Sequence, residues 1–202
     1  MNQNEQLQDQ NLNPPVVTEE QNTENPFWEI LRFALIAIVI VLPVRWYIAQ
    51  PFIVSGASME TTFHNNEYLI VDQFTYHFRE PERGEVIIFH YPIDPTKYFI
   101  KRVIGLPGET VSIEDNTVKI INQDNPEGIV LDEPYIADAM TTGDQSFILG
   151  KEEYFVMGDN REHSSDSRSW GTLDEGEIVG RAWLRLFPPT ELSFLPGSHQ
   201  SK

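Results

Sequence analysis

A serine and a lysine are the two residues of this chain that together could perform acyl transfer. Ser58 lies in the run Ser55-Gly56-Ala57-Ser58-Met59, and Lys101 opens the run K-R-V-I-G-L-P-G. A serine hydroxyl attacks a carbonyl carbon only if another group takes its proton, and lysine can take it only as the neutral amine. Considered separately, each residue also fits an ordinary role, Ser58 in a turn and Lys101 on an exposed strand.

The surroundings of Lys101 favour the neutral amine. Side chains alternate along an extended strand, so Phe99, Lys101 and Val103 are expected on one face. Burial between Phe and Val disfavours the ammonium and lowers the lysine pKa. Ser58 and Lys101 are far apart in the sequence, so their proximity is a prediction about the fold.

A third run, from Gly158 to Arg168, reads G-D-N-R-E-H-S-S-D-S-R. It is rich in turn-forming and hydrogen-bonding residues, as a plain surface loop also is. We expect it to orient the lysine, with Ser164 as a hydroxyl partner and with Asp166 and Arg168 as a charge-assisted pair. It does not match a calcium loop, because Arg161 and Ser164 occupy positions where such a loop has Asp or Asn and Gly.

Composition excludes several other functions. The net charge of -17 argues against nucleic acid as a partner. The chain has no cysteine, which excludes disulfides and thiol nucleophiles. The five histidines are scattered, without the i, i+4 spacing of a helical metal site. We therefore expect no metal and no cofactor.

The N-terminal part predicts a tail and a membrane anchor. Residues 1–26 are acidic, rich in Asn and Gln and poor in apolar residues, which predicts disorder. Residues 27–50 hold an apolar run between Arg32 and Arg45, flanked by the interfacial residues Trp28, Trp46 and Tyr47. We expect a transmembrane helix there because the run is apolar all round; the alternative is a buried helix of a soluble domain. The charges hardly specify an orientation.

Residues 51–190 predict a mostly β domain. Short β-rich runs alternate with Gly, Pro and Asn turn signals, and no long amphipathic helix is evident. Residues 122–145 are polar and predict a long loop or a peripheral hairpin, and residues 191–202 a C-terminal tail. The expected strands are Tyr68–Phe74, Glu85–Tyr91, Tyr98–Ile104, Thr110–Ile113, Val118–Ile121, Phe147–Met157 and Ile178–Leu186.

The three runs, in this order behind one apolar segment, resemble bacterial type I signal peptidase (leader peptidase). The resemblance extends from about Trp28 to Pro188 and implies an antiparallel β-sheet catalytic domain of that type. Carried over by position, it implies Ser58 as nucleophile, Lys101 as general base, Ser164 as the hydroxyl that bonds the lysine, and Asp166 with Arg168 as the pair behind it.

Two details of the resemblance concern the region around Ser58. The family's oxyanion hole uses the backbone N–H of the nucleophile, here Ser58, and some members add a hydroxyl two residues earlier. That position is Gly56, and Ser55 is one place off, so a side-chain donor stays open. Thr61 stands where the family usually has proline, which predicts a looser turn.

The resemblance implies an enzyme of the cell membrane. Its substrates would be exported preproteins with small residues at positions -1 and -3 of the signal peptide, its tail would be cytoplasmic and its catalytic domain extracytoplasmic. The apolar residues beside the nucleophile fit either a protein core or a substrate cleft and lipid-facing patch; they are Phe52, Ile53, Val54, Met59 and Phe63. Rival interpretations are a self-cleaving Ser/Lys-dyad protein and a catalytically decayed, membrane-tethered β domain that binds partners.

Overall fold

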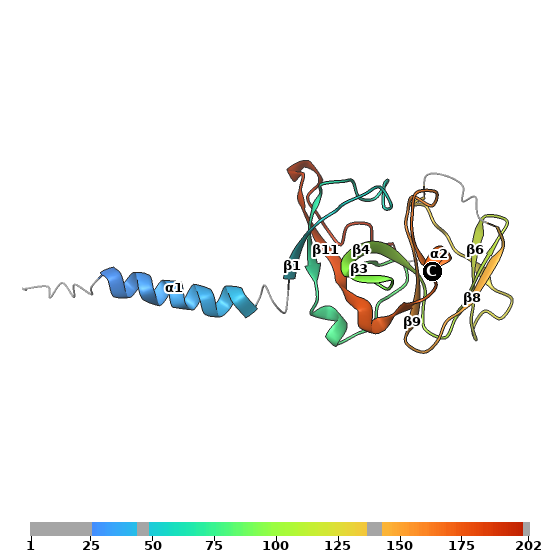
Figure 1. The fold of residues 1–202 in the computed structure, drawn as a ribbon, viewed down its shortest axis with the longest axis horizontal. Coiled ribbons are helices and arrows are strands. Elements are labelled where there is room, and N and C mark those ends of the chain that lie inside the picture. The colour runs from blue at the N-terminus through green and yellow to red at the C-terminus, as the bar shows by residue number, and fades with distance from the viewer. Residues whose placement is uncertain (1–25, 44–48, 137–142, 200–202) are drawn as a thin grey trace, which may run out of the picture. The chain divides into compact units, whose positions relative to one another are not determined.

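A computed structural model describes residues 26–43, 49–136 and 143–199. The chain divides into two compact units, Met1–Ile40 and Val41–Lys202 (Figure 1). The tail predicted for residues 1–26 lies outside the described residues except for Pro26. Arg45, Trp46 and Tyr47, predicted to flank the anchor, also lie outside them.

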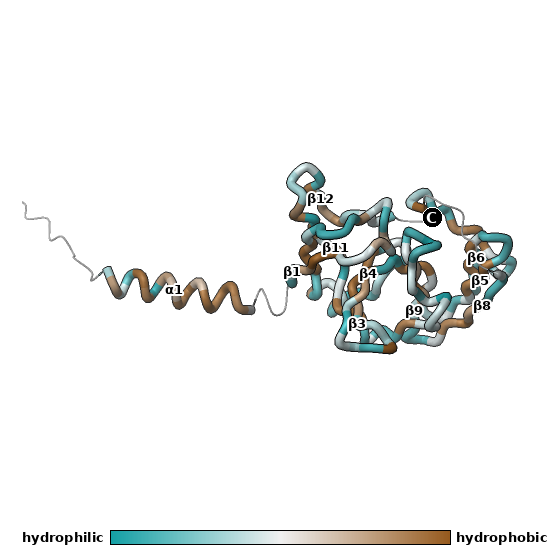
Figure 2. Tube along the Cα trace, turned by 45° about the horizontal axis from the view of Figure 1, so that its top comes forward, coloured by the Kyte–Doolittle hydropathy of each residue, from teal (hydrophilic) through white to brown (hydrophobic). Residues whose placement is uncertain are grey.

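The described part of the first unit is helical and belongs to α1, which covers Pro26–Pro43. Proline is well placed at the first helical position, where its missing N–H is not needed. The predicted segment ran to residue 50, but Ala49 and Gln50 belong to a β-strand, so the helix does not extend that far. Its apolar side chains are exposed, from Phe27 to Leu42, and Figure 2 shows it as apolar over most of its length. Among the described residues, no helix combines the length and apolar content required to cross a membrane.

The second unit is built from antiparallel strands, which confirms the predicted mostly β class. The larger sheet has the order β1-β2-β11-β3-β4-β9-β10, with β12 paired to β11. Its strands are β1 (Ala49–Ile53), β2 (Tyr68–Asp72), β3 (Val86–Tyr91), β4 (Asp94–Gly105), β9 (Glu153–Met157), β10 (Leu173–Asp174), β11 (Ile178–Phe187) and β12 (Ser193–Phe194). Between them lie the short helix α2 (Ser167–Trp170) and three 3₁₀ turns at Thr75–His77, Glu175–Glu177 and Pro189–Glu191.

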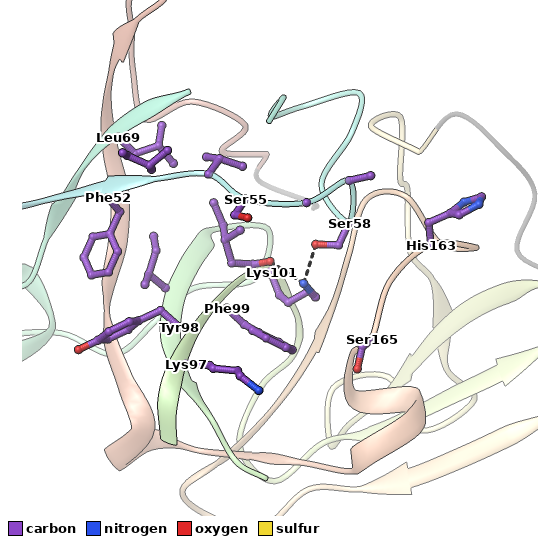
Figure 3. Close-up of a pocket in the computed structure, with 16 residues that line it drawn as sticks. Phe52, Ser55, Ser58, Leu69, Lys97, Tyr98, Phe99, Lys101, His163 and Ser165 are labelled. Atoms are coloured by element: carbon purple, nitrogen blue, oxygen red, sulfur yellow. Dashed lines mark hydrogen bonds between the residues drawn. The ribbon is translucent and has the colours of Figure 1, made fainter. Parts of the chain in front are cut away.

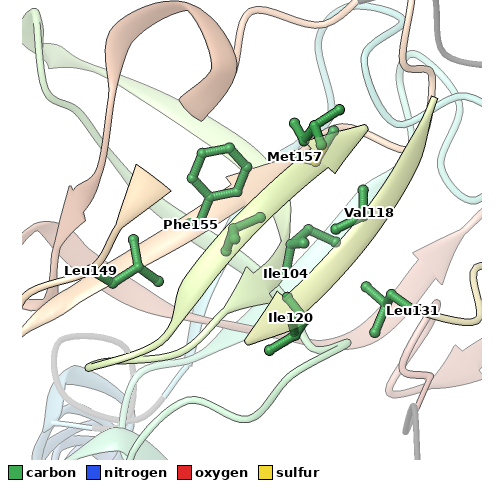
Figure 4. Close-up of a cluster of buried hydrophobic side chains, with 9 residues drawn as sticks. Ile104, Val118, Ile120, Leu131, Leu149, Phe155 and Met157 are labelled. Atoms are coloured by element: carbon green, nitrogen blue, oxygen red, sulfur yellow. The ribbon is translucent and has the colours of Figure 1, made fainter. Parts of the chain in front are cut away.

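The smaller sheet has the order β7-β6-β5-β8. Its strands are β5 (Thr110–Glu114), β6 (Thr117–Ile121), β7 (Ile129–Val130) and β8 (Gln145–Ile148). It packs on β4 and β9 of the larger sheet through a buried cluster that includes Ile104, Phe155 and Met157 on one side and Val118 and Ile120 on the other (Figure 4). This packing fixes the end of β4 that follows Lys101.

The observed limits differ from the prediction in places: β4, for example, begins at Asp94 and not at Tyr98. Phe147–Met157 is not one strand: β8 and β9 belong to different sheets, and the Glu153 carboxylate accepts the Gly150 N–H in the turn between them. Residues 122–145 contain β7, which pairs with β6, while 137–142 lie outside the description. The predicted C-terminal tail packs on the domain, because β12 pairs with β11 and the His199 N–H donates to Gly84 O.

A second apolar cluster lies beneath the turn that follows β1. Val54, Met59 and Phe63 are almost fully buried there, against Leu69 and Ile88. Met59 and Phe63 are therefore core residues, which decides between the two roles left open for them. Burying both side chains turns the intervening backbone into a tight loop.

Candidate active site

Ser58 lies at the start of the turn that follows β1. The Glu60 N–H donates to Ala57 O (3.1 Å) and the Phe63 N–H to Met59 O (2.8 Å), which closes the turn. Gly56 has a φ of 100°, a conformation that a residue with a side chain rarely adopts. The turn thus anchors Met59 in the core while the Ser58 hydroxyl faces Lys101 (Figure 3).

Lys101 projects from β4, where it is paired with Ile87 of β3. Its side chain is buried, and Nζ lies 2.7 Å from Ser58 Oγ and 2.9 Å from Ile100 O. Nζ also lies 5.1 Å from the centroid of the Phe99 ring, as expected for two residues on one face of the strand. The fold therefore brings together the serine and the lysine that the sequence singled out.

The environment of Lys101 lowers its pKa to about 8. Burial is the main cause, because the ammonium loses its hydration, while the nearby carboxylates of Asp166 and Asp159 act in the opposite direction. A substantial fraction of neutral amine is then present at mildly alkaline pH. A neutral amine at hydrogen-bond distance from a serine hydroxyl can accept its proton.

The loop from Gly158 to Asp166 holds the Ser58 turn. Asn160 donates twice to that turn, from its backbone N–H to Ser58 O (3.1 Å) and from Nδ2 to Ala57 O (3.1 Å). A Cβ atom on Gly158 would overlap both Ser58 O and Ser164 Oγ, so only glycine allows this close approach.

Asp166 and Arg168 form a bidentate ion pair behind the loop. Arg168 Nε and Nη2 each lie 2.8 Å from an Asp166 carboxylate oxygen. Asp166 is buried, accepts the Gly158 N–H at 3.0 Å and caps the N-terminus of α2. The bond from Gly158 to Asp166 thus joins the two ends of the loop, and Arg168 holds its middle by donating to Arg161 O.

Ser164 does not form the hydrogen bond with Lys101 that the sequence predicted. Its Oγ is buried and has no hydrogen-bond partner within the described parts of the chain. Lys101 Nζ instead bonds to Ser58 Oγ and to Ile100 O. Ser164 Oγ packs beside Gly158, close to the dyad but not bonded to it.

In the turn that carries the hydroxyl, the backbone N–H of Ser58 is a candidate oxyanion donor. Gly56 N–H is already engaged, since it donates to Asn65 Oδ1 at 3.0 Å. Within the described ranges, no group accepts the Ser58 N–H. This donor is therefore available to a carbonyl oxygen placed beside the hydroxyl.

Thr61 has a φ of 90°, which is strained for a β-branched residue and impossible for proline. Its hydroxyl donates to Tyr135 O at 2.7 Å. The turn is thus held by the segment after β7, and is not the loose turn predicted from the missing proline.

Sequence reasoning missed a buried ion pair next to the site. Arg102 Nε lies 2.8 Å from Asp159 Oδ1, and both side chains are almost fully buried. Arg102 also donates to Gly84 O and Gly197 O. Alternation along β4 placed Arg102 on the face opposite Lys101, but nothing in the sequence indicated its partner.

A cleft of about 440 Å³ opens beside the two residues. Residues 52–58 form one side and residues 97–101 of β4 the other, with Leu69 and Ile88 at the apolar base. Phe52, Ile53 and Val54 line it, whereas Met59 and Phe63 do not. His163 and Ser165 line it from the Gly158–Asp166 loop.

No group of three or more His, Asp or Glu side chains is arranged to hold a metal ion in the part of the chain that the structure describes.

A family model and similar sequences indicate the same family. The family model for signal peptidase, peptidase S26, matches residues 27–187. A probable signal peptidase I-2 of Synechocystis sp. is 33% identical over 182 residues, covering 87% of this chain and 80% of that protein. Signal peptidase I of Bacillus licheniformis is 33% identical over 189 residues, covering 87% and 98%. A crystal structure of a signal peptidase I from Enterococcus faecalis is 31% identical, with a TM-score of 0.44, and covers 51% of this chain and 97% of that one.

Proposed function

Since the chain belongs to the signal peptidase family, peptidase S26, we propose that it is a serine endopeptidase that removes N-terminal signal peptides from exported preproteins. Ser58 is the nucleophile and Lys101 the general base. The observation that carries this proposal is the 2.7 Å contact between Lys101 Nζ and Ser58 Oγ, with the lysine buried and its pKa lowered to about 8.

The proposed reaction proceeds in two steps. Neutral Lys101 takes the proton from Ser58 as Oγ bonds to the scissile carbonyl carbon, and the Ser58 N–H stabilises the oxyanion; one such donor is worth ~3 kcal/mol. The lysine proton passes to the departing amine, the C–N bond breaks and an acyl-enzyme remains. Lys101 then takes a proton from water, which attacks the ester carbon. The proton passes to Ser58 Oγ as the ester C–O bond breaks, which releases the signal peptide and restores the neutral lysine.

The cleft suits an extended peptide. Residues 98–101 of β4 pair with β3 on one side, and the pairing of β4 with β9 begins only at Arg102. A substrate strand can therefore add its backbone hydrogen bonds to this free edge. Small side chains at positions -1 and -3 would face the apolar wall around Leu69, Ile88 and Ile100.

We further propose that α1 forms the main part of a single-pass anchor in the cell membrane, since by itself it falls short of a complete span. A helix of 18 residues is ~27 Å long, close to the ~30 Å of a bilayer's hydrocarbon core. Its exposed side chains from Phe33 to Leu42 are apolar on every face. The N-terminal tail would be cytoplasmic and the β domain extracytoplasmic, where the signal peptides emerge.

Cleavage of a preprotein by the detergent-solubilised full chain tests the function. The wild type should release the mature protein, and Ser58→Ala and Lys101→Ala should each abolish the product. Ser146→Ala and Lys119→Ala are matched controls, because these residues lie on β8 and β6 of the smaller sheet. A wild type that binds the preprotein without cutting it would indicate a binding module.

A further inference from the structure

Two polar residues line the cleft on the side of the dyad opposite the apolar wall. Figure 3 shows Phe52 and Tyr98 on one side of Ser58 and Lys101, and His163 and Ser165 on the other. Both polar residues belong to the Gly158–Asp166 loop and are exposed. The proposed mechanism gives them no role.

The direction in which the substrate runs through the cleft decides which of its residues lies at the polar end. This step rests on the proposed function. If the residues before the scissile bond occupy the apolar wall, the chain after the bond must leave past His163 and Ser165. The first residue of the released protein, position +1, is then the one nearest His163.

Hydrogen bonding fixes which ring nitrogen of His163 is free to bind another group. Asn160 Nδ2 donates to Ala57 O, so Asn160 Oδ1 is the atom that lies 3.3 Å from His163 Nδ1. An amide oxygen only accepts, hence Nδ1 carries the hydrogen. In the neutral ring Nε2 is then an acceptor, and within the described residues it has no partner.

We propose that His163 is a specificity-determining residue that selects the side chain at position +1 of the substrate. Its Nε2 atom accepts a hydrogen bond from a donor side chain such as serine, threonine, asparagine or glutamine. A carboxylate offers no donor to an acceptor, and the strong negative charge of the chain (-17) disfavours it further. Because Asn160 also holds Ser58, the same asparagine orients both the nucleophile and the selecting ring.

Peptides that differ only at position +1, with Gln, Ala or Asp, test this assignment on the full-length protein. For the wild type, kcat/KM should be about five-fold higher with Gln than with Ala, the worth of one hydrogen bond, and lowest with Asp. In His163→Ala the Gln to Ala ratio should fall to about one. His163→Gln should keep part of the ratio because its amide oxygen can accept. His77→Ala, at a histidine outside this cleft, should keep the wild-type ratio.

The outcomes separate this inference from the function on which it rests. Equal kcat/KM for Gln and Ala in the wild type, or an unchanged ratio in His163→Ala, overturns the role of His163 while the peptidase function stands. A wild type that cleaves neither these peptides nor a preprotein removes both.

Discussion

Lys101 is the residue on which activity and stability make opposite demands. Its folded pKa of about 8 lies below the ordinary value of 10.5. Below pH 8 the ammonium is present in both the folded and the unfolded chain, but only the folded chain holds it away from water. Between pH 8 and 10.5 the unfolded chain binds more protons, so stability rises with pH and reaches its full value above 10.5.

Lys101→Met should therefore stabilise the fold at neutral pH. The shift of the pKa from 10.5 to about 8 corresponds to a burial cost of ~3 kcal/mol. Methionine removes this cost at pH 7, and the hydrogen bonds lost with the amine reduce the gain in stability. The gain should shrink as pH rises from 8 to 10.5. Denaturant unfolding at several pH values measures the gain. Lys119→Met, at a partly exposed lysine paired with Glu114, should change stability little. A destabilised Lys101→Met protein at pH 7 would contradict the burial cost.

The sequence predicted contacts between residues that lie close together along the chain. Strand alternation correctly grouped Phe99 with Lys101, and the polar run indicated the pair of Asp166 and Arg168. It could not reveal the pair of Arg102 and Asp159, because these residues meet only through the pairing of β4 with β9.

Among the elements, the loop from Gly158 to Asp166 determines where Ser58, the proposed nucleophile, lies. This loop follows β9, and β9 pairs with β4, the strand that carries Lys101. The loop that holds Ser58 therefore starts next to that strand. The distance between lysine and serine thus depends on a clamp supplied by a third segment.

Asn160→Ala should lower kcat more than it raises KM. It removes the hydrogen bond from Nδ2 to Ala57 O and leaves the backbone bond to Ser58 O. One lost hydrogen bond corresponds to a rate loss of about five-fold, and a displaced nucleophile adds to it. Steady-state kinetics on the alanine +1 peptide measure the effect, with Asn125→Ala in the β6–β7 connection as control. An unchanged kcat in Asn160→Ala would show that the clamp is dispensable.

Element boundaries were predicted less well than element types. The strands β2, β3, β5 and β6 were expected close to their observed limits, since alternation and turn residues mark them. β1 was missed because its first two residues, Ala49 and Gln50, were included in the segment 27–50 assigned to the anchor. The split of β8 from β9 was missed because Leu149 is apolar although it lies between two sheets.

For the whole molecule, α1 presents a run of exposed apolar side chains, while the β domain has its own buried core and further exposed apolar residues such as Ile148 and Phe194. The exposed side chains of the helix include Phe33, Val39 and Ile40, each more than half exposed. Apolar surface of this extent is typical of a segment that contacts lipid. The anchor remains a proposal that membrane extraction can test.

Val39→Lys combined with Ile36→Glu should release the chain from membranes. Each charge near the centre of an inserted helix costs ~3 kcal/mol. After expression in a bacterial cell, the wild type should stay in the membrane pellet on alkaline extraction, and the double variant should shift to the supernatant. The control variant Ile148→Lys, at an exposed apolar residue of β8, should stay in the membrane pellet as the wild type does. A double variant that stays in the pellet would exclude α1 as the anchor.

The pH dependence of kcat/KM for a cleavable peptide tests the proton transfer from Ser58 to Lys101 most directly. If the buried amine is the base, activity should rise with an apparent pKa near 8 and level off above it, because only the neutral form accepts the proton. A rise that follows an ordinary lysine near 10.5, or the same profile in Lys101→Ala, would contradict the account.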